Sequence, residues 1–374
     1  MKNIPEIRIK GFEGEWKEKQ LKDVCEVNPT TSVPDRFEYV DLESVVGTTM
    51  VKHRTEEKAT APSRAQRHAK YNDIFFQTVR PYQKNNYLFQ KKEDNYVFST
   101  GYAQLRANIN PEYLFIILQS TSFVNQVLLN CTGSNYPAIN PSALSNIDIN
   151  ITESDAEQQS LGSFFSSFDR LLSDHHRRLE NLRRVKKSML QKMFPQQGQT
   201  VPEIRFKGFS GEWKEKQLGE ALEIGNGTDY KHLGEGNIPV YGTGGIIKYV
   251  DDYLYDGETV CIGRKGTIDS PIYHVGKIWT VDTLFYTYDF KDCNVKFLYY
   301  LFCTINWKEH NEATGVPSLS KENIKRIVAR FPNLAEQHLI GSFFTSLDNL
   351  INDEVNYIDQ LTRVKSTLLQ KMFV

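Results

Sequence analysis

The sequence predicts an α+β protein with an internal repeat. Two mixed, strand-rich globular domains are expected to be joined and separated by two long helices that pair as an antiparallel coiled coil. Three observations predict this fold: an opening motif occurs twice, an apolar stripe with helical spacing occurs twice, and the sequence between the repeats scarcely matches. A duplicated frame around two dissimilar inserts suggests one device that addresses two different targets from equivalent positions.

The opening motif spans residues 5–21 and returns at residues 202–218, with differences only at Ile9/Phe206 and Glu13/Ser210. A closing motif begins Ala-Glu-Gln, continues Gly-Ser-Phe-Phe and ends Leu-Gln-Lys-Met-Phe; it occupies residues 156–194 and again residues 335–373. The offset between copies is 197 residues for the opening motif and 179 for the closing motif, so the first insert is 18 residues longer. The predicted order is therefore insert, helix, insert, helix.

Each closing motif carries apolar residues at alternating steps of three and four, which is the pattern of a long amphipathic helix of the coiled-coil type. At about 1.5 Å per residue, a helix of this length reaches roughly 50 Å. A lone helix with such a stripe needs a partner, and the other copy is the obvious one. An antiparallel pair would place the two inserts at opposite ends. The residues expected to pair the helices or to dock a partner are Leu161, Phe165, Phe168, Leu172, Leu182, Ile340, Phe344, Leu347, Ile351 and Leu361.

The two predicted helices differ in charge. Residues 170–192 contain eight basic and two acidic side chains, whereas residues 348–371 contain three basic and four acidic ones. Two interpretations stay open for this contrast: a solvated charged face, or pairing between the helices or with a partner protein.

The expected domains are residues 1–155 and 202–334, with long helices at 156–194 and 335–374 and a short polar linker at 195–201. Short β-branched and aromatic runs punctuated by glycine predict twisted sheets in the inserts. Residues 112–118 and 297–303 indicate buried helices. Both inserts end with a similar short motif, in which Pro137 and Pro317 each lie ten residues before an isoleucine. This similarity suggests a shared fold.

Composition limits the function classes. With 374 residues, 40% hydrophobic and 24% charged, the chain is typical of a globular protein of two or three domains, and its net charge of −1 neither favours nor excludes a nucleic-acid partner. Five cysteines at scattered spacings predict reduced thiols and no metal site. The longest apolar stretch is too short for a membrane span. We expect a soluble, cytoplasmic protein.

Catalytic signatures are scarce. The sequence contains no GxxxxGK[ST], HExxH, GxSxG or helix-opening GxGxxG motif, and no catalytic residue is assigned. Asp35, Glu56 and Lys58 fit a nuclease-like PD…ExK pattern, which arises readily by chance. The Gly-rich residues 241–246 could cradle a phosphate through backbone amides, although a tight turn between strands is the commoner explanation.

Nucleic-acid binding has stronger support. Residues 50–92 contain ten basic and three acidic side chains, and arginine, lysine and asparagine are the residue types that hold phosphates or read base edges. A solvated basic surface is the alternative explanation. The DNA-binding candidates are Arg64, Arg67, Lys70, Arg80, Tyr82, Lys84 and Asn85 in the first insert, and Lys231, His232, Tyr241, Thr243, Arg264 and Lys265 in the second.

The repeated opening and closing motifs, together with Val-Tyr-Gly-Thr-Gly-Gly-Ile, Ile-Gly-Arg-Lys-Gly and Thr-Val-Arg-Pro-Tyr, resemble the specificity (S) subunits of type I DNA restriction–modification systems. The resemblance covers the whole chain. It implies that each insert reads one half of a bipartite, asymmetric site in double-stranded DNA, while the helices set the spacer and dock two modification subunits and a restriction subunit. S-adenosylmethionine, ATP and magnesium would belong to those partners and not to this chain. A stand-alone DNA-modifying or DNA-cleaving enzyme and a protein-only coiled-coil scaffold are the rival interpretations.

Overall fold

The protein folds into two compact units that each combine one strand-rich domain with parts of both long helices. A computed structural model describes residues 3–133 and 135–373. The first unit comprises residues 1–177 and 356–374, and the second comprises residues 178–355. The mixed helix and strand content around two long helices confirms the predicted fold class.

The first domain contains two four-stranded sheets and a hairpin. The strand orders are β6-β3-β10-β7 and β2-β11-β8-β9, and the hairpin is β4–β5. Strand β10 pairs with β3 in parallel, whereas the other pairings among these described strands are antiparallel. Phe75 of β8 stacks on Phe98 of β10 with ring centroids 3.6 Å apart and holds the two sheets together. The strands are β2 Cys25–Val27, β3 Arg36–Val40, β4 Val45–Val46, β5 Thr49–Met50, β6 Arg54–Glu57, β7 Ala65–His68, β8 Asp73–Gln77, β9 Tyr87–Leu88, β10 Tyr96–Ser99 and β11 Tyr102–Ala107. The short helices are α1 Leu21–Val24, η1 Pro81–Gln83, α2 Pro111–Gln119, α3 Thr121–Leu129 and α4 Pro141–Ser145.

The second domain contains one six-stranded sheet in the order β14-β19-β17-β18-β15-β16. Its strands are β14 Glu223–Asn226, β15 Glu235–Gly242, β16 Gly245–Val250, β17 Tyr255–Gly263, β18 Ile272–Thr280 and β19 Leu284–Tyr288. Its short helices are α6 Leu218–Ala221, α7 Val295–Thr304, η2 Trp307–His310 and α8 Lys321–Arg326.

The two domains share a core although their sequences differ. The antiparallel strands β2, β11 and β8 have the same order as β14, β19 and β17. A buried helix follows in each domain, α2 or α7, and each is capped at its first turn by an asparagine, Asn110 or Asn294. Both predicted buried helices are confirmed, and the shared topology supports the expectation of a common fold.

The long helices have equal lengths of 39 residues: α5 spans Asp155–Met193 and α9 spans Leu334–Met372. Different residues cap them in the same way. The Ser154 hydroxyl accepts a hydrogen bond from the Glu157 amide, and the Asn333 carboxamide oxygen accepts one from the Glu336 amide. The two helices therefore begin at equivalent positions even though the sequences before them differ.

Within each unit the two helices pack antiparallel. In the first unit Phe165 is fully buried and lies 5.7 Å from Phe373 between ring centroids, while in the second unit Phe344 is fully buried and lies 6.1 Å from Phe194. The predicted pairing residues divide into two classes by burial. Buried are Leu161, Phe165, Ile340, Phe344 and Leu347, and half-buried are Phe168, Leu172, Leu182, Ile351 and Leu361.

The duplicated opening motifs hold the start of each domain to a helix through the same contacts. Arg8 forms a bidentate ion pair with Glu157 at 2.7 and 2.8 Å. Arg205 repeats it with Glu336 at 2.6 and 2.7 Å. Strand β1 (Lys17–Gln20) pairs with β12 (Asp148–Ile151), just as β13 (Lys214–Gln217) pairs with β20 (Val328–Phe331). Each domain is thus closed by a two-stranded ribbon where it meets its helix.

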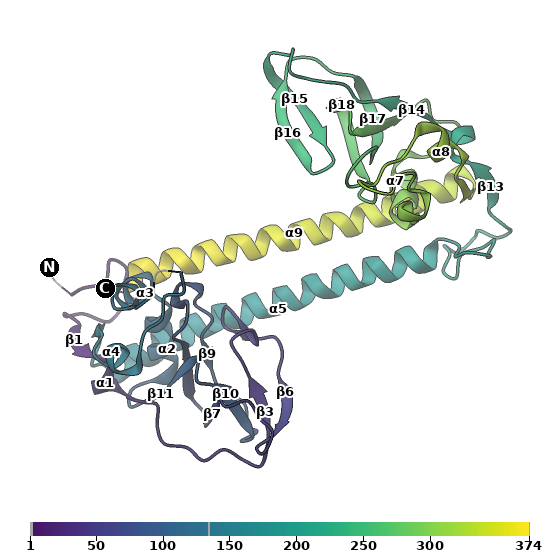
Figure 1. The fold of residues 1–374 in the computed structure, drawn as a ribbon. Helices are drawn as coiled ribbons and strands as arrows, with labels where there is room; N and C mark the ends of the chain where they lie inside the picture. Colours follow the sequence, from purple (N-terminus) through teal and green to yellow (C-terminus); the bar gives the residue numbers. More distant parts are fainter. Residues whose placement is uncertain (1–2, 134, 374) are drawn as a thin grey trace. The chain divides into compact units, whose positions relative to one another are not determined.

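The same motifs also bind the C-terminal end of a long helix. In the second unit the Ile204 amide donates to the Lys192 carbonyl at the end of α5. In the first unit the Ile7 amide donates to the Lys371 carbonyl at the end of α9, so the start and the end of the described chain lie side by side (Figure 1). The continuous connection after α5 and the meeting of the chain ends therefore occupy equivalent places.

One glycine in each long helix permits close packing against the domain. A Cβ atom built on Gly162 would lie 2.9 Å from the Asn110 side chain, and one built on Gly341 would lie 2.9 Å from the Asn294 side chain. Because both asparagines cap the buried helices, each glycine lets a long helix approach the first turn of α2 or α7.

All five cysteines are free thiols. Among residues 3–133 and 135–373, no helix combines the length and the apolar character that crossing a bilayer requires.

Candidate nucleic-acid interface

Both domains present a loop from the same structural position, after β8 in the first domain and after β17 in the second. In the first domain, Val79 forms an isolated β-bridge with Ala138, and the Arg80 amide donates to the Pro137 carbonyl. In the second domain, Lys265 bridges Ser318, and the Gly266 amide donates to the Pro317 carbonyl. The prolines noted in the sequence therefore fix equivalent loops. These loops carry the candidate cations Arg80, Arg264 and Lys265.

Arg80 is held in an unusual conformation. Its φ of 54° lies in the left-handed region, which a residue with a side chain adopts only when its surroundings impose it. Its guanidinium carbon lies 4.4 Å from the ring centroid of Tyr136, which is 64% exposed. Tyr82 follows in η1 and is 51% exposed. Tyr136 could not be identified from the sequence, because its role depends on contact with a residue 56 positions away.

Arg64 lies near this loop. The turn at Thr100–Gly101 contacts both segments, since the Thr100 amide donates to the Arg64 carbonyl and the Gly101 carbonyl accepts from the Thr78 amide. Arg64 is exposed, and its side chain has no partner among the described residues. The structure therefore brings Arg64 and Arg80 to one edge of the first domain.

Lys70 lies away from that edge. Strand β8 begins at Asp73, after Lys70, and ends at Gln77, before Arg80. At about 3.3 Å per residue, β8 separates these two candidates by more than about 13 Å. The Lys70 side chain is exposed and has no described partner.

Arg67 lies in β7 and is half-buried. Its Nε is buried without a hydrogen-bond partner, and burial lowers the pKa of the guanidinium. A buried donor without an acceptor costs about 1–3 kcal/mol, so such a group is a candidate for binding a ligand oxygen.

Lys84 and Asn85 are engaged within the protein. The Lys84 ammonium donates to the Gln119 carbonyl at 2.9 Å, and burial, followed by the charge of Lys365, lowers its pKa. The Asn85 carboxamide oxygen accepts from the Gly47 amide at 2.8 Å. These two side chains stabilise the β4–β5 hairpin and the α2–α3 junction, so they are less available to a ligand than Arg64 or Arg80.

The second domain gathers its candidates around the ends of β15 and β17. Arg264 and Lys265 are exposed, and a Cβ atom built on Gly266 would lie 3.9 Å from the Thr243 hydroxyl. Tyr241 is half-buried, and burial raises the pKa of its phenol. Residues 241–246 form the hairpin turn between β15 and β16, so the turn interpretation of the Gly-rich segment is confirmed.

Lys231 and His232 lie in the loop before β15, and both are exposed. The His232 ring packs on Trp279 with centroids 5.7 Å apart. Trp279 itself is 5% exposed, and its indole donates to the Thr228 carbonyl, as expected of a core residue.

Internal ion pairs neutralise part of the basic segment 50–92. Lys52 pairs with Glu43 at 3.1 Å, and Arg54 pairs with Asp41 at 2.8 Å. Both carboxylates lie outside the segment, so its net charge in sequence overstates its local excess of positive charge.

The three residues of the nuclease-like pattern, Asp35, Glu56 and Lys58, make contacts that stabilise the fold. The Lys58 amide donates to the Asp35 carbonyl, which closes the β3–β6 pairing, while the Glu56 carboxylate pairs with Arg54 at 2.7 Å. Among residues 3–133 and 135–373, no group of three or more His, Cys, Asp or Glu side chains is placed to hold a metal ion.

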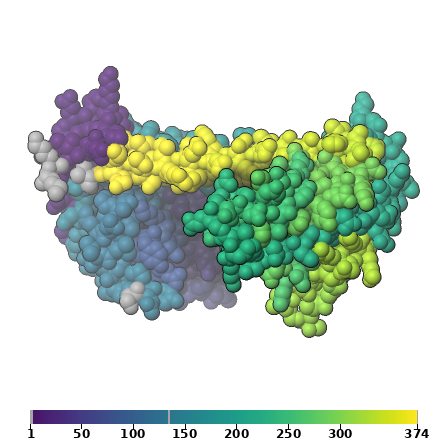
Figure 2. Space-filling model, turned by 90° about the horizontal axis from the view of Figure 1, so that it is seen from above, coloured from purple at the N-terminus to yellow at the C-terminus, as the bar shows by residue number. Residues whose placement is uncertain are grey.

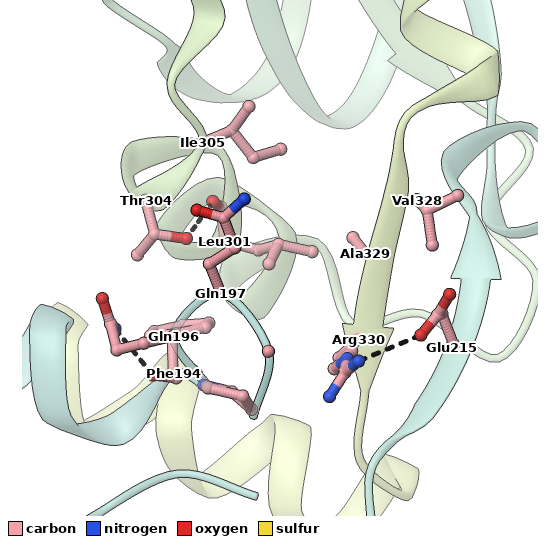
Figure 3. A pocket seen from close by; sticks show the side chains of 12 residues that line it. Phe194, Gln196, Gln197, Glu215, Leu301, Thr304, Ile305, Val328, Ala329 and Arg330 are labelled. Carbon is pink, nitrogen blue, oxygen red and sulfur yellow. Dashed lines mark hydrogen bonds and ion pairs between the residues drawn. The ribbon is translucent and has the colours of Figure 1, made fainter. Parts of the chain in front are cut away.

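At the junction of a long helix with its domain, the second unit has an open groove, and the corresponding space in the first unit is almost filled. In the second unit, the link after Phe194, the end of α7 and β20 enclose about 300 Å³, and Arg330 pairs with Glu215 beside it (Figure 3). The corresponding space in the first unit is only about 10 Å³, because Ser122, Phe123 and Gln126 of α3 fill it.

A sequence family described as type I restriction modification DNA specificity domain matches residues 13–184 and again residues 210–363. The two matches correspond to the two halves of the internal repeat.

Curated relatives include the type I restriction enzyme EcoprrI specificity subunit of Escherichia coli, 23% identical over 44% of this chain and 42% of that protein. The HindI specificity subunit of Haemophilus influenzae is 25% identical over 39% of this chain and 34% of that protein. The chain thus spans about a third to two fifths of the length of these relatives.

Two solved structures share the fold. The type I restriction–modification system S subunit from M. genitalium has a TM-score of 0.71 at 17% identity and covers 99% of both chains. A chain from a structural study of complex assembly and conformational transition of the type I R-M system has a TM-score of 0.57 at 20% identity, covering 96% of this chain and 97% of its own.

Proposed function

Because the chain belongs to the family of type I restriction–modification DNA specificity proteins, we propose that it is the non-catalytic subunit that selects the DNA sequence. Each strand-rich domain reads one half of a bipartite site in double-stranded DNA. The long helices set the gap between the halves and dock the other subunits.

One observation carries this proposal: two dissimilar domains present cationic residues from the same loop. Arg80 and the pair Arg264–Lys265 follow equivalent strands, and each loop is fixed by the same β-bridge to a proline-containing segment. Arginine binds guanine edges or phosphates, and a loop can carry it into a groove of the duplex. Two loops at equivalent positions that carry different side chains are what we expect if the two domains bind different DNA sequences.

The differences between the domains support an asymmetric site. The loop after β8 carries a single arginine stacked on Tyr136, whereas the loop after β17 carries adjacent Arg264 and Lys265. The position equivalent to Tyr136 is Val316, which is 56% exposed. Because the contacting residues differ in number and kind, the two half-sites should differ in sequence.

Partner docking is supported by a second apolar stripe on each long helix. At seven-residue intervals, apolar side chains beside the buried seam stay partly exposed, and Figure 2 shows the surface of α9 open to solvent along one side. Exposed apolar residues with this spacing are Leu350, Tyr357 and Val364 on α9, and Phe164, Leu171 and, two heptads after Leu171, Val185 on α5. A heptad repeat of this kind suits further helices. We assign it to two copies of the modification subunit, because the stripe occurs twice, with the restriction subunit joining that assembly.

Methyl transfer and ATP-driven cleavage would then reside in those partners, which would bind S-adenosylmethionine, ATP and magnesium. A complex of this kind acts on cellular DNA, so we place the chain in the cytoplasm.

The direct test is a binding selection from random duplexes with the chain and its modification subunit. We expect recovery of two short, unlike sequences separated by a fixed gap. Equal affinity for random duplexes at matched salt would contradict the proposal. Arg80→Ala should relax the selected sequence in one half-site only, and Arg264→Ala should relax it in the other. Lys17→Ala, at an exposed surface pair with Glu153, serves as the control and should leave both half-sites unchanged.

A further inference from the structure

An exposed face of α5 in the second unit carries positive charge that no contact described so far uses. Arg183, Arg184 and Lys187 line a surface hollow of about 490 Å³ together with Glu180, and all four residues are exposed. Arg183 pairs with Glu180 at 2.9 Å, and the Arg184 guanidinium donates to Asn181. Lys187 has no acidic partner in the described part of the chain. Three cations against one carboxylate leave this cation cluster (Arg183, Arg184 and Lys187) with an excess of positive charge.

The cation cluster lies on the turns of α5 that are attached to the second domain through Lys186. Lys186, next to Lys187, pairs with Asp348 at 2.5 Å, and its ammonium lies 5.6 Å from the ring centroid of Tyr300 in α7. Arg183 lies one helical turn before Lys187. The hollow therefore lies on the turns of α5 that belong to the same unit as Arg264 and Lys265.

In the first unit, residues of the domain help to line the equivalent surface. The positions of α9 that correspond to Arg183 and Lys187 are Thr362 and Ser366, which line a cavity of about 470 Å³. Residues Val46–Thr49 of the β4–β5 hairpin and Lys84 enclose this cavity from the other side. In the second unit, by contrast, residues of α5 alone line the hollow.

The chemistry of the lining favours a polyanion over a protein. All four lining residues carry charge, and none is apolar. Stable protein interfaces have an apolar centre that is depleted in charged residues. Arginine and lysine clusters are, by contrast, the usual contacts to DNA phosphates.

We propose that the cation cluster binds phosphate groups of the DNA duplex beside the half-site that the second domain reads. The inference rests on the proposed function, since it assumes that duplex DNA lies against this domain. Phosphate contacts add affinity and fix the position of the protein, but they carry no sequence information. The cluster therefore strengthens binding without altering the sequence that is selected.

The test measures how DNA affinity depends on salt, with the chain assembled with its modification subunit. Each phosphate contact contributes about 0.9 to the slope of log K against log salt. The triple variant R183Q/R184Q/K187Q should reduce that slope by up to about 2.7 for specific and random duplexes alike. The selected sequence should stay the same. The double variant R183K/R184K should keep the slope, because a phosphate accepts lysine as a point charge.

A matched control removes one charge from the equivalent position of α9. Arg363→Gln corresponds to Arg184→Gln, and Arg363 pairs with Asp359 at 2.7 Å on an exposed surface. We expect a reduced slope for Arg184→Gln and an unchanged slope for Arg363→Gln.

Three results would overturn the inference: an unchanged slope in the triple variant, a change in the sequence that it selects, or loss of the modification subunit from the complex without a change in slope. Failure of the proposed function gives a different result, because the wild-type complex would then show no sequence preference at any salt concentration.

Discussion

The two units repeat their contacts at the helices and differ where the domains extend from them. In the first unit Asp169 pairs with Lys365 and accepts a hydrogen bond from Thr48 in the β4–β5 hairpin. In the second unit the equivalent Asp348 pairs with Lys186 and accepts one from Tyr300 in α7. An aspartate–lysine pair that joins the helices is thus common to both units, while each domain reaches the aspartate by its own route. A frame of identical residues tolerates dissimilar domains because each domain needs only a few fixed attachment points.

The largest expected loss of stability comes from removing the aromatic side chain at the centre of each helix–domain junction. Phe165→Ala and Phe344→Ala should each lower the free energy of unfolding by about 3–5 kcal/mol, because each ring is fully buried and leaves a cavity. Urea denaturation measures the loss, and hydrogen exchange should localise it to the first unit for Phe165 and to the second for Phe344. Phe164→Ala, at a ring that is 39% exposed, is the control and should cost far less.

The buried ion pairs provide the next comparison. Glu157→Ala and Glu336→Ala should each cost about 3 kcal/mol, because removing one partner leaves an arginine largely buried without its counter-charge. The side chains of Arg8 and Arg205 are 14% and 15% exposed, so the two losses should be similar. Thermal unfolding of the two variants measures them. The equivalence of the units would be wrong if one variant were as stable as the wild type. Glu153→Ala, at an exposed ion pair, should have no measurable effect.

A smaller effect is expected at the helix glycines. In Gly162→Ala and Gly341→Ala the added methyl group collides with the first turn of α2 or α7, which costs about 1–3 kcal/mol, offset in part by roughly 1 kcal/mol of improved helix propensity. Both variants should therefore unfold slightly earlier in urea. A stabilised variant would show that the domain can move away from the helix at that point.

The smallest expected effect comes from the hydrogen bonds by which each domain contacts the equivalent aspartates, Asp169 and Asp348. Tyr300→Phe removes a hydrogen bond of 2.8 Å and should cost about 1 kcal/mol, whereas Thr48→Val removes one of 3.4 Å and should cost less. Equal losses in urea titrations would mean that the hairpin contact is as important as the tyrosine contact.

The repeated parts of the fold were predictable from sequence because their patterns are local. The three-and-four spacing from Leu161 and from Ile340 gave both long helices, and the two copies of the opening motif gave the two halves. The β4–β5 hairpin and the split of the first domain into two sheets were not predictable, because they depend on pairings between strands far apart in the chain.

The candidate site was predictable only by residue type. Arg64 and Arg80 are accessible and close to one edge, whereas Lys84 and Asn85 are bound to Gln119 and Gly47. Sequence shows the charge of a lysine but not the carbonyl that its ammonium contacts. Tyr136 was missed for the same reason, since only the fold places it under Arg80.

A change of helix length tests the spacer part of the proposal. Insertion of one heptad after Arg177 and one after Asn356, where the two units meet along the helices, lengthens the helix pair by about 10 Å, or about three base pairs of duplex. Methylation profiling of a host that carries the altered chain with its partner genes should show a longer gap between unchanged half-sites. Altered half-sites with the original gap would refute this role of the helices.

The central claim is that each domain reads its own half-site from an equivalent position. The most direct measurement is the site selected by a chimera in which residues 17–154 are replaced by a second copy of residues 214–333, which join the helices through the same two-stranded ribbon. The account predicts a symmetric site made of two copies of the second half-site, in inverted orientation. Selection of the original asymmetric site, or of no sequence by a folded and assembled chimera, would contradict it.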